Sequence, residues 1–115
     1  MSDPRLSPAS FIAVTAAGIY FLSHMVRAEV PDAEATKLTG KYGCQACHSL
    51  NTKLVGPSFQ DVAKKYSGDK HASETLTHKI KTGGSGVWGP IPMPPASSAS
   101  DVDVALLVEW ILSQK

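Results

Sequence analysis

Apolar side chains recur at helical spacing in four separate segments of the chain, which predicts four short helices. The segments cover residues 32–42, 59–66, 72–81 and 100–111. The last segment is the clearest, and its broad apolar face is formed by Val104, Leu106, Leu107, Val108, Trp110 and Ile111. No segment alternates apolar and polar residues for long enough to predict a strand, so we expect an all-α fold.

Residues that typically begin or end helices flank these segments. Asp32 is placed to cap the first helix, and Gly43 follows its end. Gly68 closes the second helix. Ser100, with Asp103 three positions later, resembles a capping box before the last helix, although aspartate is a poorer partner than glutamate at that position.

The amino-terminal segment has a different pattern from the rest of the chain. Residues 6–26 contain no Asp, Glu, Lys or Arg, and residues 11–22 form an apolar run of signal-peptide length. Because Ala28 and an aliphatic residue two positions before it suit signal peptidase, we predict a leader of residues 1–28 and a domain of residues 29–115. Residues 6–26 are also nearly long enough to span a bilayer, so an uncleaved membrane anchor stays open. Either outcome places the domain outside the cytoplasm, in the periplasm.

The length and charge of the chain narrow its function class. Its 115 residues indicate a single domain with a thin apolar core. The formal net charge is +1 and there is no run of basic residues, so nucleic-acid binding is not indicated. Lysines gather in the middle of the chain and acids toward its end. A mildly basic docking rim and an ordinary solvated surface therefore both stay open.

Residues 44–48 read Cys-Gln-Ala-Cys-His, a C-x-x-C-H run that is the attachment signature of a c-type haem. The spacing suits the chemistry, because Cys44 and Cys47 can each add across one haem vinyl group to form a thioether bond. His48 follows directly and can supply its imidazole as one axial ligand of the iron. A covalently held haem would also add apolar volume to the thin core.

Three other chemistries use a pair of cysteines at this spacing. A thioredoxin-like redox pair is expected in a βαβ setting, and no strand is predicted before Cys44. A zinc site usually has four protein ligands, whereas the chain has only two cysteines and its other histidines lie at no familiar zinc spacing. A disulfide across a two-residue gap would be strained and would leave His48 unexplained. We therefore favour haem attachment.

A second segment, residues 83–95, is rich in Gly and Pro and cannot form a helix or a central strand. A plain surface loop would seldom need its apolar residues, which include Trp88. Met93 lies between two prolines, which fix the backbone on either side of it. A stiff loop loses little entropy when it holds a weak thioether ligand on iron, so Met93 is our candidate sixth ligand.

Rival sixth ligands are few. Met1 and Met25 lie in the leader segment. His71 and His78 are each more simply surface histidines on a polar segment, and a lone methionine is otherwise core filler. Ligation by one histidine and one methionine stabilises ferrous iron and closes the iron to substrates, which favours electron transfer over oxygen or peroxide chemistry.

The residues quoted so far closely resemble those of the class I cytochromes c, in particular the small bacterial cytochromes of the c-551/c-552 type. The resemblance extends over about residues 32–115. Its most specific matches are residues 43–48, 55–63, 86–95 and 109–115.

The resemblance implies an all-α cytochrome c fold, with about four short helices wrapped around one covalently bound haem c. In the family the first and last helices cross at the base of the haem pocket. Cys44 and Cys47 would carry the thioether bonds, and His48 and Met93 would be the axial iron ligands.

The resemblance also implies roles for residues around the haem. The carbonyl of Pro57 would accept a hydrogen bond from the far ring nitrogen of His48 and tune the imidazole. The indole of Trp88 would bind a haem propionate, and Lys79 falls where the family carries a basic residue near a propionate. Ala96 replaces a carboxamide residue that is common in the family, which bears on the stiffness of the methionine loop.

The function implied is a single-haem electron carrier in the periplasm, with no catalytic residue and therefore not an enzyme. Implied partners are respiratory redox proteins, such as a cytochrome bc1 complex upstream and a terminal oxidase or nitrite reductase downstream, and we expect a monomer. Two alternatives stay open. One is the cytochrome subunit of a periplasmic dehydrogenase, and the other is a haem peroxidase or gas-binding protein with an open sixth position.

Overall fold

The computed structural model describes residues 28–115, and within them the all-α prediction is confirmed. The only strand-like pairing in this range consists of two isolated bridges, between His48 and Lys53 and between Gly84 and Met93. The elements in chain order are α1 (Asp32–Lys41), the 3₁₀ turn η1 (Cys44–Ala46), α2 (Phe59–Lys65), α3 (Ala72–Thr82) and α4 (Asp101–Leu112).

The predicted leader and membrane anchor lie outside the described residues, apart from Ala28 itself. None of the helices between residues 28 and 115 has the length and apolarity needed to cross a bilayer.

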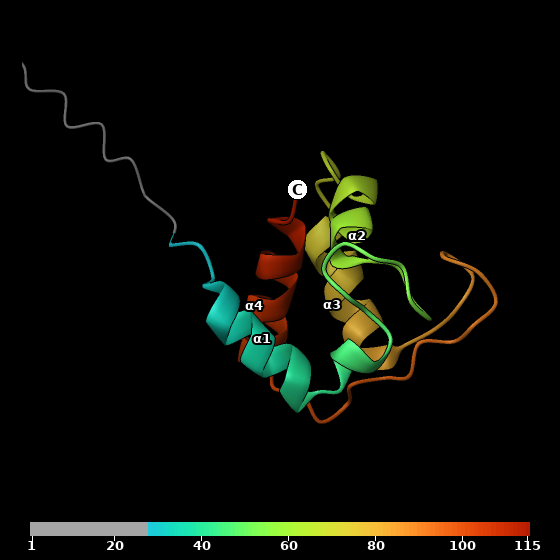
Figure 1. The fold of residues 1–115 in the computed structure, drawn as a ribbon, viewed down its shortest axis with the longest axis horizontal. Helices are drawn as coiled ribbons and strands as arrows, with labels where there is room; N and C mark the ends of the chain where they lie inside the picture. The colour runs from blue at the N-terminus through green and yellow to red at the C-terminus, as the bar shows by residue number, and fades with distance from the viewer. Residues whose placement is uncertain (1–27) are drawn as a thin grey trace, which may run out of the picture.

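Helix α4 is the centre of the fold, because α1, α2 and α3 all pack against it (Figure 1). Its residues Val104 and Leu107 are almost completely buried, as is Ala35 of α1. Two long loops lie beside this helical group. One follows η1, and the other joins α3 to α4 and swings out from the helices in Figure 1. The loops carry most of the predicted site residues.

The predicted cap of α4 is present, whereas the predicted cap of α1 is wrong. Ser100 accepts a hydrogen bond from the backbone N–H of Asp103 at 3.1 Å. Helix α1 instead follows Pro31 without a side-chain cap, and Asp32 is its first helical residue. The carboxylate of Asp32 accepts a hydrogen bond from the indole N–H of Trp110 at 2.8 Å. Because Trp110 is 93% shielded from solvent (7% exposed), its indole needs a protein acceptor, and Asp32 meets that need.

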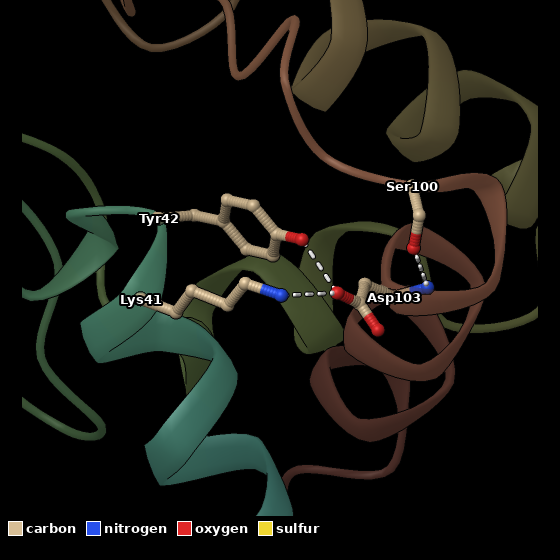
Figure 2. Close-up of polar contacts among 4 residues, drawn as sticks. All are labelled: Lys41, Tyr42, Ser100 and Asp103. Atoms are coloured by element: carbon tan, nitrogen blue, oxygen red, sulfur yellow. Dashed lines mark hydrogen bonds and ion pairs between the residues drawn. The ribbon is translucent and has the colours of Figure 1, made fainter.

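Polar contacts join the first turn of α4 to the ends of α1 and α3. Asp103 accepts a hydrogen bond from the phenol of Tyr42 at 2.5 Å and pairs with the ammonium of Lys41 at 3.2 Å (Figure 2). Asp101 pairs with Lys81 at the end of α3. The hydrogen bond from Tyr42, with Lys41 beside it, lowers the pKa of the Asp103 carboxyl below its usual value.

We expect the stabilisation by Asp103 to depend on pH. A carboxyl whose pKa is lower in the folded chain stabilises the fold above its unfolded pKa, about 4, and this contribution is lost as the pH falls through the lowered folded value. The difference in unfolding free energy between the wild type and Asp103→Asn should therefore be largest near neutrality and shrink in acid. Urea unfolding followed by circular dichroism at several pH values measures it. A difference that stays constant with pH would contradict the expectation.

Candidate haem-binding site

A large cavity of about 660 Å³ lies between α2, α3, α4 and the two long loops. Its walls include apolar side chains from three helices, such as Val62, Leu76 and Leu107. All seven residues predicted from the sequence line it, namely Cys44, Cys47, His48, Pro57, Lys79, Trp88 and Met93. Residues nearly fifty positions apart in the sequence therefore share one apolar cavity.

The C-x-x-C-H segment folds as one tight turn. Gly43 has a left-handed backbone, with φ of 73°, which lets the chain reverse directly after α1. The backbone N–H groups of Cys47 and His48 both donate to the carbonyl of Cys44, at 3.2 and 3.0 Å. This turn brings both sulfur atoms and the imidazole to the same wall of the cavity.

The orientation of His48 is set by its neighbours. The Nδ1 atom lies 2.7 Å from the carbonyl oxygen of Pro57, so an N–H at Nδ1 donates to it and leaves the Nε2 lone pair free to bind a metal. The ring stacks on Phe59 with centroids 5.5 Å apart. A Cβ at Gly56 would lie 2.5 Å from Cε1 of His48, so only glycine fits there without a shift.

The loop that carries Met93 is held by its own backbone. Gly84 and Met93 exchange two hydrogen bonds, of 3.0 and 2.8 Å. Gly83 has φ of 67°, and a Cβ there would lie 2.4 Å from the carbonyl oxygen of Met93. At the far end of the loop, the N–H of Ala96 donates to the carbonyl of Ile80 at 2.8 Å. The main chain thus supports the loop at the position where the family often has a carboxamide.

Two further side chains predicted from the resemblance lie at the cavity edge. Trp88 is 44% exposed, and the ammonium of Lys65 lies 5.4 Å from its ring centroid. The ammonium of Lys79 lies close over Gly84, where an added Cβ would be 2.9 Å away. Both residues are therefore near the rim, where a charged group of a bound cofactor could meet them.

The residues present fit a covalently bound haem better than the alternative chemistries. Burial raises the pKa of the Cys44 thiol, whereas a reactive redox cysteine has a lowered pKa. Among residues 28–115, no three side chains of His, Cys, Asp or Glu gather as metal ligands would in a zinc site. Two thiols, one free imidazole nitrogen and one thioether in an apolar cavity are the donor set of a c-type haem.

The rival histidines lie elsewhere. His71 precedes α3 and is 4.0 Å from the carboxylate of Glu74. His78 is on the same helix and contacts the hydroxyl of Thr82 at 3.3 Å. Neither histidine lines the cavity.

Three residues that shape the site had no assigned role in the sequence analysis. Phe59 was expected only as a helix residue, yet its ring stacks on His48. Gly56 and Gly83 contact the two predicted axial ligands. Two features of the sequence could have indicated these glycines. Gly56 lies directly before Pro57, and Gly83 lies directly after a helix.

An apolar cavity lined by a C-x-x-C-H turn, within a small helical domain, defines a c-type haem protein. The chain belongs to the cytochrome c family, whose sequence model matches residues 33–115. It is 53% identical to cytochrome c-552 of Hydrogenobacter thermophilus over 79 residues, 69% of this chain and 80% of that protein. It is 42% identical to cytochrome c-551 of Pseudomonas aeruginosa over 110 residues, 96% of this chain and all of that one.

The solved structures give the same result. The crystal structure of cytochrome c552 from Nitrosomonas europaea is similar with a TM-score of 0.67 and 49% identity, over 70% of this chain and 99% of that one. The predictions of a cytochrome c fold, of the small bacterial class I type and of one covalently bound haem c are confirmed. The protein is a small c-type cytochrome that carries electrons between redox proteins.

Proposed function

We propose that this chain is a single-haem electron carrier of the periplasm in which His48 and Met93 are the axial ligands. The observation that carries the proposal is that both side chains line one cavity and that other residues of the chain hold each of them in place. His48 is held by Pro57 and Phe59, and Met93 is held by its backbone bonds to Gly84.

The protein side chains have separate tasks in this proposal. When bound, the haem supplies an iron that changes between the ferrous and ferric states. Cys44 and Cys47 fix the position of the group, and Pro57 keeps the His48 tautomer that exposes Nε2. Met93 would supply the second iron ligand and would exclude others. We assign no catalytic residue, because electron transfer needs none.

Partner docking fits the rim of the cavity. Val55 and Ile91 line the cavity and are 53% and 63% exposed, so apolar surface surrounds the opening. Lys53 and Lys79 line the same cavity. We propose that redox partners with an acidic surface dock at this rim, with a cytochrome bc1 complex as donor and a terminal oxidase or nitrite reductase as acceptor, and that the carrier is a monomer.

Optical spectra test the ligation and the function together. We expect the oxidised protein to show the weak far-red sulfur-to-iron band, and carbon monoxide to leave the spectrum of the reduced protein unchanged. Binding of carbon monoxide by the wild type would overturn the proposal and favour a peroxidase or gas-binding role.

The mass of the mature protein tests the proposed localisation. Cleavage after Ala28 should give a chain that begins at Glu29 and carries the added mass of one haem. A chain that retains the leader would instead support an anchor facing the periplasm.

A further inference from the structure

Asp103 connects the end of α1, which leads into the C-x-x-C-H turn, to the first turn of α4, which follows the loop that carries Met93. Its carboxylate accepts the phenol hydrogen bond of Tyr42 at 2.5 Å and pairs with Lys41 at 3.2 Å, both at the end of α1 (Figure 2). Its backbone N–H donates to the side chain of Ser100, the residue that caps α4. The Asp103 side chain is 20% exposed and that of Lys41 is 57% exposed, so the part-buried bond from Tyr42 is better shielded from water than the pair with Lys41.

The contact between Asp103 and Tyr42 lies directly before the C-x-x-C-H turn, residues 44–48, which we call the attachment turn. Tyr42 is followed by Gly43 in its left-handed conformation and then by Cys44. The turn itself is tied to α1, because the Gln45 amide donates to the hydroxyl of Thr39 at 2.9 Å and to the carbonyl of Thr36 at 3.1 Å. The turn therefore moves with the end of α1, and Asp103 fixes that end on α4.

A second side-chain hydrogen bond between α1 and α4, from Trp110 to Asp32, lies too far away to do this. Trp110 donates to Asp32, which is the first residue of α1, whereas Tyr42 follows its last residue. A helix of that length separates the two contacts by about 15 Å along its axis. Loss of the Asp32 contact would free the start of α1 and leave the end beside Cys44 in place.

The same turn of α4 also ends the methionine loop. Ser100 follows Ala99, whose N–H donates to the carbonyl of Ala96, and Ala96 is itself bonded to α3 at Ile80. Asp101 pairs with Lys81 at the end of α3, and Gly84, three positions after Lys81, exchanges two hydrogen bonds with Met93. The chain before Cys44 and the chain after Met93 thus meet at one helical turn.

We propose that Asp103 is a positioning residue that holds the attachment turn at a fixed place relative to the methionine loop. The inference rests on the proposed attachment at Cys44 and Cys47 and on ligation by Met93. A thioether is a weak ligand, and relative movement of the two segments would lengthen and open its bond to iron. Asp103 acts on the iron only through Tyr42 and the α4 turn.

Hydrogen exchange of the reduced holoprotein by NMR tests the positioning directly. In Asp103→Ala and in Tyr42→Phe, the amides of Ala46, Cys47 and His48 should exchange about tenfold faster, the factor expected for loss of a hydrogen bond to a charged group. Tyr42→Phe removes the phenol hydroxyl and keeps both charges, so it separates position from charge. The matched control is Asp32→Ala, which removes the acceptor of the Trp110 indole N–H at the other end of α1 and should leave these three amides unchanged.

Imidazole binding to the oxidised protein gives a second readout, because imidazole replaces a methionine ligand that has opened. We expect the binding rate to rise about five- to tenfold in Asp103→Ala and Tyr42→Phe, and to stay at the wild-type value in Asp32→Ala. Equal acceleration in all three variants would show that Asp103 contributes only to overall stability. Unchanged exchange of the turn amides in both Asp103→Ala and Tyr42→Phe would also overturn the inference. Failure of the ligation proposal would appear separately, as a missing far-red band in the wild type.

Discussion

Replacing Met93 by alanine is expected to leave the iron with one protein ligand and to lower the reduction potential by on the order of 0.1 V, a part of the ~0.8 V range that axial ligands span. The thioether stabilises ferrous iron, so its loss favours the ferric state. The fold should survive, because the bonds between Gly84 and Met93 use only backbone atoms. A redox titration measures the potential, and carbon monoxide should now bind the reduced protein.

The matched control for this prediction is Ile91→Ala in the same loop. Ile91 also lines the cavity, but it is 63% exposed and has no ligand atom. Its replacement should leave the far-red band in place and carbon monoxide excluded. If Met93→Ala kept the wild-type potential and still excluded carbon monoxide, another group would have to be the sixth ligand.

The helices could be predicted from the sequence because their signals are local. Apolar spacing within about ten residues identified all four helices, and Ser100 caps α4 as expected. The role of Asp32 could not be read in this way. Its carboxylate is used by Trp110, 78 positions along the chain, and that demand arises only when α1 packs on α4.

The residues of the candidate site could be predicted where a motif or a residue in its setting has few other possible roles. Cys44, Cys47 and His48 form a contiguous motif, and Met93 is set apart by the prolines on either side of it. The structure brings all four residues to one cavity.

The supports of the site were not predictable, because they are contacts between distant segments. Tyr42 counted as one more apolar position of the first helix, yet its hydroxyl binds Asp103, 61 positions away. Phe59 counted as a core residue of the second helix, yet its ring stacks on His48. Periodicity shows which face of a helix is buried, but not which side chain a buried ring or hydroxyl will meet.

Replacing Gly56 by alanine is expected to destabilise the fold by about 2–3 kcal/mol, as overpacking at a rigid contact does. The added Cβ would lie 2.5 Å from Cε1 and 2.9 Å from Nδ1 of His48. The imidazole has little freedom to retreat, because Nδ1 is bonded to Pro57 at 2.7 Å and the ring stacks on Phe59. Either the loop or the ring must move, so the proposed bond between His48 and the iron should weaken as well. Urea unfolding measures the first effect, and the reduction potential measures the second.

Gly68→Ala separates this contact from the general cost of losing a glycine. Gly68 has φ of 77°, which alanine adopts only with strain, but a Cβ there would meet no atom within 4 Å. That variant should lose about 1 kcal/mol from backbone strain and keep the wild-type potential. Gly56 does not have a left-handed backbone, so its alanine variant should lose stability through the close contact with His48 instead. If the two variants lost equal stability and neither changed the potential, the close approach of Gly56 to His48 would not constrain the axial ligand.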